Sequence, residues 1–224
     1  MSMLGHWISY QRSIKLIDID TIVYNNTMCS KKRVEALAKA IHFVVDNNVP
    51  GDFVECGTWR GGLAALMLHN ITMHCLDKKI YIYDTFEGMP EPGENDCNTS
   101  KRMYEENKGD WCKAGLEVVQ SVLEEIASSY NHYCRFVVGK VEDTLDSTHP
   151  KTIALARLDT DWYSSTKKEL EVLYPLVVSN GFVLIDDYSD WNGCRQAVDE
   201  YLATLDKATY RIELADGSLV IQKK

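Results

Sequence analysis

Short apolar runs alternate with amphipathic stretches along most of the chain. Five runs are rich in apolar and β-branched or aromatic residues, and they cover 52–57, 79–86, 134–141, 152–161 and 181–188. Apolar runs of this kind, separated by helical segments, are typical of parallel strands whose two faces are both buried. The pattern therefore predicts a parallel sheet with helices on both faces.

The stretches between these runs place apolar residues three and four positions apart. The first covers 30–47 and starts at Ser30, a favourable N-cap residue. We predict the other helices over 61–71, 116–130, 165–174 and 194–207. Within the fourth of these, Thr166 and Glu169 have the spacing of a capping box. Residues 209–224 hold two further runs joined by Asp216-Gly217, which predicts a terminal antiparallel hairpin.

The length allows one domain with a substantial core, since the chain has 224 residues of which 45% are hydrophobic. No internal repeat or low-complexity tract divides it. We predict an N-terminal helical arm or cap over 1–48 and the main domain over 49–224.

Charge and targeting signals narrow the function classes. A formal net charge of −9 with no long basic run argues against nucleic acid as a partner. The N-terminus lacks the apolar core of a signal peptide, and no apolar stretch reaches membrane-spanning length, so we expect a cytoplasmic protein without a membrane partner. The seven cysteines are scattered and form no Cys-x-x-Cys, which favours reduced thiols over disulfides or zinc ligation.

Acidic residues follow several of the predicted strands. Asp84, Asp159 and the pair Asp186-Asp187 stand where apolar runs end, and Asp161 follows directly. In parallel sheets covered on both faces, ligands bind beyond the carboxyl ends of the strands, so we expect one crevice to receive these side chains. The alternative is that Asp161 and Asp187 cap the helices that follow them.

A glycine-containing loop follows the first predicted strand. Its glycines are Gly57, Gly61 and Gly62, and Trp59 stands where the dinucleotide fingerprint requires a second glycine, which disfavours NAD. Glu55 would repel a pyrophosphate but attract a ligand with an amino group and a sulfonium, such as S-adenosylmethionine. The alternative is that these glycines only let the following helix pack closely.

The late carboxylates suggest a hard metal ion. Asp159, Asp186 and Asp187 offer oxygen ligands with no His or Cys close in sequence, which suits Mg²⁺ rather than zinc. A divalent ion beside a sulfonium methyl would bind a substrate hydroxyl and lower its pKa, which predicts O-methylation by direct displacement. Asp84 would accept a hydrogen bond from the ribose of the cofactor.

Several longer segments closely resemble the macrocin O-methyltransferase family. They are VPGDFVECGTWRGG, YDTFEGMP, VEDTL, LARLDTDWYSST, LYP, NGFVLIDDY and CRQAVDEY, and the resemblance runs from about Thr27 to the end of the last helix. It implies a Rossmann-like class I methyltransferase fold, an α/β architecture with a mostly parallel seven-stranded sheet, helices on both faces and a C-terminal antiparallel hairpin. It also implies methyl transfer, dependent on S-adenosylmethionine and Mg²⁺, to a hydroxyl of a sugar on a glycan, a nucleotide or a glycosylated natural product.

The resemblance implies roles for individual residues. The metal ligands would be Asp159, Asp186 and Asp187, with Asp159 as general base and Asp161 as the next candidate. The methionine end of the cofactor would contact Glu55, Gly57, Trp59, Arg60, Gly61 and Gly62, and the ribose would contact Asp84. Thr27-Met28 matches a segment that folds over the cofactor.

The acceptor would be selected by the polar segment 87–117, which we predict to act as a lid. Five aromatic residues could stack on the sugar ring of the acceptor, and the alternative is that they pack in the core. They are Tyr104, Trp111, Tyr163, Tyr188 and Trp191.

Two other functions compete with O-methylation: an NAD-linked dehydrogenase on a similar fold, and a non-catalytic S-adenosylmethionine-binding module. The sequence leaves open the identity of the hydroxyl acceptor and whether the chain forms a homodimer.

Overall fold

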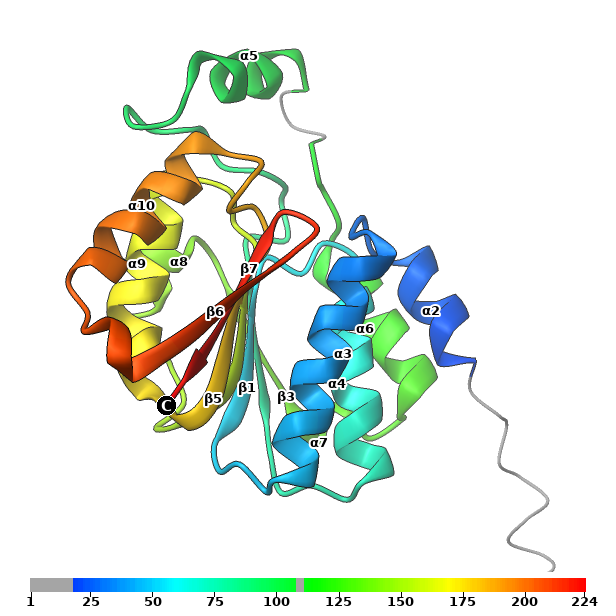
Figure 1. The fold of residues 1–224 in the computed structure, drawn as a ribbon. Helices are drawn as coiled ribbons and strands as arrows, with labels where there is room; N and C mark the ends of the chain where they lie inside the picture. The colour runs from blue at the N-terminus through cyan, green and yellow to red at the C-terminus, as the bar shows by residue number, and fades with distance from the viewer. Residues whose placement is uncertain (1–17, 108–110) are drawn as a thin grey trace, which may run out of the picture.

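The computed structural model describes residues 18–107 and 111–224. At its centre is a seven-stranded sheet with the strand order β3-β2-β1-β4-β5-β7-β6 (Figure 1). The first five strands are parallel, β7 runs antiparallel to β5 and to β6, and β3 and β6 are the two edge strands. The strands are β1 (Asp52–Cys56), β2 (Ile80–Asp84), β3 (Cys134–Val138), β4 (Ile153–Leu158), β5 (Val177–Ile185), β6 (Tyr210–Ala215) and β7 (Ser218–Lys223). This confirms the predicted parallel sheet with a closing hairpin, whose turn is at Asp216-Gly217.

Helices cover both faces of the sheet. One face carries α3 (Lys31–Asp46), α4 (Gly62–Met73) and α6 (Leu116–Ile126), with α2 (Ile19–Asn25) against α4. The other face carries α8 (Val141–Thr144), α9 (Tyr163–Leu173) and α10 (Asn192–Ala203). The remaining helical elements are α5 (Asn98–Glu106), α7 (Tyr130–Tyr133), η1 (Tyr174–Leu176) and η2 (Lys207–Thr209).

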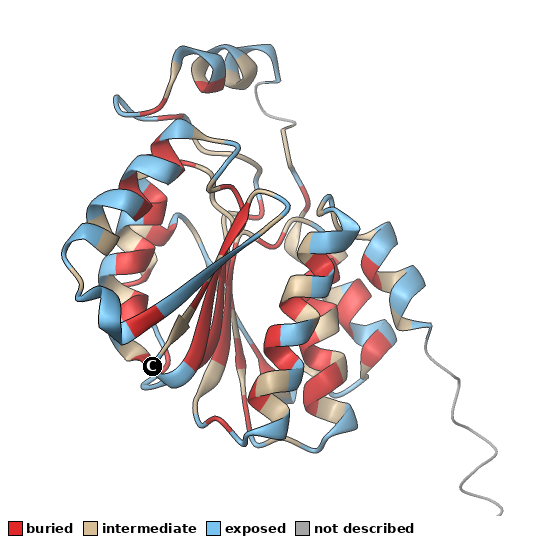
Figure 2. Cartoon of the chain, viewed as in Figure 1, coloured by how far each residue is buried: buried red, intermediate tan, exposed pale blue. Residues whose placement is uncertain are grey.

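Each face of the sheet has its own hydrophobic core (Figure 2). Successive strand residues point to opposite faces, so Phe53 of β1 belongs to the same core as Ile41 and Leu68, whereas Val54 belongs to the core of Leu170 and Val198. This alternation explains why the strands are apolar almost throughout.

The N-terminal helices are only partly as predicted. Ser30 caps α3 as expected, because its Oγ accepts a hydrogen bond from the Arg33 amide at 3.4 Å. α2 was not predicted. Of the expected arm over 1–48, residues 1–17 lie outside the described residues, and α3 packs on the sheet. The boundary at residue 48 stays a prediction.

The predicted capping box in α9 is wrong. The helix begins at Tyr163, so Thr166 and Glu169 lie inside it, where both side chains are buried. The amide of Tyr163, in the first turn, instead donates to Oδ1 of Asp96 at 3.0 Å. Asp96 belongs to the segment 87–117. That segment contains α5, and its residues 108–110 lie outside the described residues.

The strand order places the functional end of the sheet. The chain moves outward from β1 to β3 on one side and from β4 to β5 on the other, so the order reverses between β1 and β4. Such a reversal opens a crevice beyond the carboxyl ends of the strands. No helix within 18–107 and 111–224 is long and apolar enough to span a bilayer.

Candidate active site

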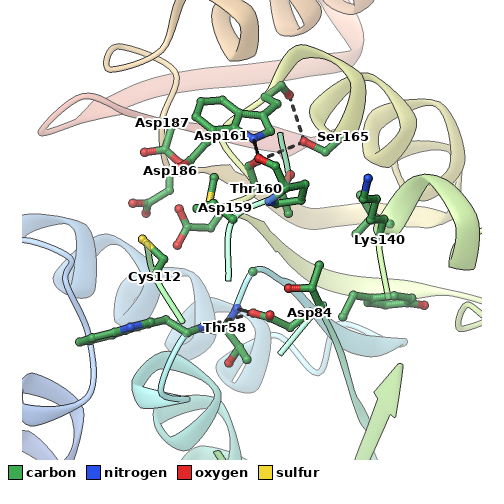
Figure 3. A pocket seen from close by; sticks show the side chains of 18 of the residues that line it. Thr58, Asp84, Cys112, Lys140, Asp159, Thr160, Asp161, Ser165, Asp186 and Asp187 are labelled. Atoms are coloured by element: carbon green, nitrogen blue, oxygen red, sulfur yellow. Dashed lines mark hydrogen bonds between the residues drawn. The ribbon is translucent and has the colours of Figure 1, made fainter. Parts of the chain in front are cut away.

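A cavity of about 320 Å³ lies at the carboxyl ends of β1, β2, β4 and β5, and its volume is typical of small-molecule sites (Figure 3). All five predicted strand-end carboxylates line it: Asp84, Asp159, Asp161, Asp186 and Asp187. Backbone pairing between neighbouring strands brings them together. The amide of Asp159 donates to Cys56 O, and the amide of Asp186 donates to Leu158 O, each at 2.9 Å.

Three of the carboxylates share one small space. One oxygen each from Asp159, Asp161 and Asp187 lies within 4.8 Å of the others. Burial, together with the carboxylates of Asp159 and Asp186, raises the pKa of Asp161 to about 7. Burial raises the pKa of Asp187 well above its usual range, and its Oδ2 is buried without a hydrogen-bond partner among the described residues. An unpaired oxygen amid mutually repelling carboxylates fits a bound cation.

Asp186 has different surroundings. Its oxygens contact two guanidinium groups, Arg33 Nη1 at 3.0 Å and Arg157 Nη2 at 3.4 Å. Although burial opposes the effect, Arg157 and Arg33 lower the pKa of Asp186. An oxygen of Asp186 and the thiol sulfur of Cys29 also lie within 4.8 Å of an oxygen of Asp159 and of each other. Asp159 therefore belongs both to this group and to the group of Asp161 and Asp187.

Arg157 connects the glycine loop to the acidic cluster. It faces Glu55 in the register between β4 and β1, and its Nη1 lies 3.1 Å from Glu55 Oε1. The same nitrogen donates to Gly57 O at 3.2 Å, while Nη2 bonds Asp159 Oδ2. Sequence analysis missed this residue, although a single cation inside an apolar run was a visible signal.

Glu55 lies behind the cavity. Its side chain is fully buried, and Thr58 Oγ1 donates to its Oε2 at 2.6 Å. Burial raises the pKa of Glu55, and the Arg157 guanidinium acts in the opposite direction. Both oxygens are therefore bonded within the protein.

The glycines of the loop serve close packing. Gly57 has φ +76°, and a Cβ there would lie 1.9 Å from the backbone oxygen of Asp159. A Cβ on Gly61 would meet Val119 Cγ1 of α6 at 2.9 Å, and one on Gly62 would meet the Asn26 backbone oxygen at 2.6 Å. Only Gly57 of the three lines the cavity. The packing alternative thus accounts for Gly61 and Gly62.

Of the other residues predicted to contact the cofactor, some line the cavity and one does not. Trp59, Thr27 and Met28 line the cavity, whereas Arg60 does not. Arg60 donates to Asn26 Oδ1 at 3.2 Å and stacks over Trp59 with its Cζ 5.7 Å from the ring centroid.

Asp84 is held by backbone amides and still faces the cavity (Figure 3). Its Oδ2 accepts from the amides of Thr58 at 2.8 Å and Trp59 at 3.3 Å, and its Oδ1 accepts from Phe86 at 2.7 Å. The carboxylate is therefore fixed in orientation.

Sequence analysis left two structural alternatives open: helix capping by Asp161 and Asp187, and core packing of the aromatic residues. The structure disagrees with the first and agrees with the second for Trp111 and Trp191. The N-caps of α9 and α10 are Trp162 and Trp191, and neither helix receives a side-chain cap from Asp161 or Asp187. Capping therefore does not explain these carboxylates. By contrast, Trp111 and Trp191 pack edge to face with Trp162, at centroid distances of 5.6 and 5.4 Å. None of the five predicted aromatic residues lines this cavity.

Other lining residues were not anticipated. They include Cys29, Arg33, Thr58, Cys112, Lys140, Glu142 and Thr160. Most come from loops that meet the site only in the folded chain, so no local pattern identifies them.

The comparisons with known proteins agree with this geometry. The model of the family described as macrocin-O-methyltransferase (TylF) matches residues 9–223. The chain belongs to the macrocin O-methyltransferase family. Membership makes the protein an S-adenosylmethionine-dependent O-methyltransferase, which confirms the predicted activity and excludes the dehydrogenase alternative.

Two curated relatives and one solved structure illustrate the family. Demethyldecarbamoylnovobiocin O-methyltransferase from Streptomyces niveus is 33% identical over 89% of this chain and 76% of its own length. A Streptomyces olivaceus enzyme, the 8-demethyl-8-(2,3-dimethoxy-alpha-L-rhamnosyl)-tetracenomycin-C 4′-O-methyltransferase, is 35% identical over 79% of this chain and 67% of its own. The structure of the O-methyltransferase NovP superimposes with a TM-score of 0.78 and 33% identity, covering 89% of this chain and 82% of that one. The predicted class I methyltransferase fold is thereby confirmed.

Proposed function

We propose that this macrocin O-methyltransferase family member methylates a sugar hydroxyl of a glycosylated small molecule, a glycan or a nucleotide sugar, with Mg²⁺ as metal cofactor. The S. olivaceus relative is named for methylating a rhamnosyl compound, which supports the sugar class. The observation that carries the metal is the group of Asp159, Asp161 and Asp187 oxygens within 4.8 Å, together with the unpaired Asp187 Oδ2.

The carboxylates have separable roles in this proposal. Asp159 and Asp187 hold the cation, and Asp186 remains the third predicted ligand, with its oxygens shared with Arg33 and Arg157. Such a cation would polarise the acceptor hydroxyl and offset the repulsion among the carboxylates.

Asp161 suits the role of general base better than Asp159. Arg157 Nη2 already occupies Asp159 Oδ2, and Asp159 is itself a proposed metal ligand. Burial raises the pKa of Asp159 well above its usual range, and the Arg157 guanidinium acts in the opposite direction. Asp161 makes no such ion pair among the described residues, and one of its oxygens lies within 4.8 Å of oxygens of the proposed ligands Asp159 and Asp187. A base must lie within hydrogen-bond reach of the acceptor hydroxyl, which the cation would hold beside this oxygen.

The cofactor would occupy the adjoining part of the cavity. Gly57 and Trp59 of the glycine loop line this part together with Thr27 and Met28, and Asp84 would accept a hydrogen bond from the ribose. The carboxylates favour the positively charged sulfonium of S-adenosylmethionine over the negatively charged phosphates of NAD. Glu55 acts from behind, by holding Thr58 and Arg157.

Two measurements test this function. Calorimetric titration should show binding of S-adenosylmethionine and its demethylated product but not of NAD. A panel of nucleotide-linked, glycan-linked and natural-product-linked deoxysugars should then include acceptors that gain one methyl group. Tight NAD binding without a response to S-adenosylmethionine would contradict the cofactor assignment, and methylation confined to non-sugar hydroxyls would contradict the sugar class.

A further inference from the structure

A buried acid behind the site has no role in the proposed reaction. Glu169 lies in the interior of α9, its side chain is fully buried, and it does not line the cavity. Its Oε1 accepts a hydrogen bond from Thr160 Oγ1 at 2.9 Å, and its Oε2 has no hydrogen-bond partner among the described residues. Burial raises the pKa of Glu169 well above its usual range.

The partner of Glu169 stands at the centre of the acidic turn. Thr160 separates Asp159 from Asp161, and its backbone oxygen accepts from the Trp162 amide at 2.7 Å and from Ser165 Oγ at 3.2 Å. Asp161 has φ +67°, a left-handed conformation that is uncommon outside glycine. Such conformations persist only where the surrounding structure holds them.

We propose that Glu169 is a positioning residue, which through Thr160 fixes the turn that directs Asp159 to the cation and Asp161 to the acceptor hydroxyl beside it. The inference rests on the proposed metal site. Glu169 suits this position because its Oε1 accepts the Thr160 hydrogen bond from outside the cavity, without entering the acidic cluster itself. A second-layer hydrogen bond that orients a ligand commonly changes metal affinity by about 10- to 100-fold.

The test measures affinity for Mn²⁺, a paramagnetic substitute for Mg²⁺, by electron paramagnetic resonance in the presence of S-adenosylhomocysteine. Glu169→Met removes the acceptor at similar volume, and Thr160→Val removes the hydroxyl. Each should weaken Mn²⁺ binding by roughly 10- to 100-fold. Glu169→Gln and Thr160→Ser keep the hydrogen bond and should stay within about twofold of the wild type.

Controls separate positioning from general destabilisation. Leu170→Ala opens a cavity in the same helix, because Leu170 is fully buried, but leaves Glu169 and Thr160 in place. It should lower the melting temperature without weakening Mn²⁺ binding. Affinity for S-adenosylhomocysteine in the absence of metal should be unchanged in Glu169→Met, Glu169→Gln and Leu170→Ala, because neither Glu169 nor Leu170 lines the cavity. The double variant Glu169→Met with Thr160→Val should lose no more Mn²⁺ affinity than the weaker-binding single variant, since both remove one interaction.

The outcomes distinguish this inference from the function on which it rests. Equal Mn²⁺ affinity in the wild type, Glu169→Met and Thr160→Val would overturn the positioning role alone. A large loss in Glu169→Gln would also overturn it, because the Gln side-chain oxygen keeps the acceptor for the Thr160 hydroxyl. A wild-type protein that binds no Mn²⁺ would overturn the proposed metal site and this inference with it.

Discussion

One oxygen of Asp161 lies within 4.8 Å of oxygens of Asp159 and Asp187, and the protonation of Asp161 therefore depends on the state of the whole cluster. Burial and its acidic neighbours raise its pKa from 3.8 to about 7. Between these values the folded chain retains a proton that the unfolded chain has lost. The stability contributed by this group is therefore present below about pH 4 and is lost as the pH rises through about 7.

Replacing the titrating Asp161 carboxyl group by an amide should make the free energy of unfolding less dependent on pH. We predict that metal-free wild type has a lower free energy of unfolding at about pH 8 than at about pH 5, and that Asp161→Asn shows a smaller difference. Urea unfolding at both pH values measures it. Asp146→Asn is the matched control, since Asp146 is solvent-exposed and distant from the cluster in sequence. An unchanged difference in Asp161→Asn would show that this carboxyl titrates normally.

At the scale of elements, the start of α9 depends on a distant segment. Asp96 is buried, and its two oxygens accept from the amides of Tyr163 and Gly93, at 3.0 and 2.8 Å. A Cβ on Gly193 would lie 1.9 Å from Asp96 Oδ1, so α10 packs closely against the same group. Trp162 Nε1 also donates to Pro90 O at 2.9 Å. The predicted lid is thus attached to the helix that follows the acidic turn.

We therefore predict that Asp96→Ala lowers the free energy of unfolding by about 1 kcal/mol, the usual cost of a lost helix cap. Asp96→Asn keeps an acceptor and should cost less. Glu94→Ala changes an exposed residue of the same segment and serves as the control. Hydrogen exchange should be faster at the first turn of α9 and across 87–107 in Asp96→Ala alone. Equally fast hydrogen exchange in Glu94→Ala would contradict the prediction that Asp96 holds the first turn of α9.

The elements also show what the sequence pattern predicts and what it misses. Uniformly apolar runs indicated the five parallel strands, and Asp216-Gly217 indicated the hairpin, because both signals are local. The pairing of Glu55 with Arg157 is not local: it exists only because β1 and β4 are neighbours in the sheet. Glu169 was misassigned for a related reason, since its partner Thr160 lies before the helix and not at a capping position.

At the scale of the whole molecule, two arginines join separate parts of the chain around the acidic site. Arg33 of α3 contacts Asp186, Asp190 and the Asp216 backbone oxygen, and these contacts link α3 to the end of β5 and to the closing hairpin. Arg157 links β4 to Glu55 of β1. The carboxylates that were predicted from their positions at strand ends are therefore held by cations from different layers of the fold.

The central claim is that these carboxylates hold a divalent cation that methyl transfer requires. The most direct test measures formation of S-adenosylhomocysteine with a sugar acceptor against Mg²⁺ concentration, for wild type, Asp187→Asn and Asp161→Asn. We predict that a chelator abolishes the wild-type rate, that Asp187→Asn requires more Mg²⁺, and that excess Mg²⁺ does not restore Asp161→Asn, whose amide cannot accept a proton. A full wild-type rate in excess chelator would contradict the account.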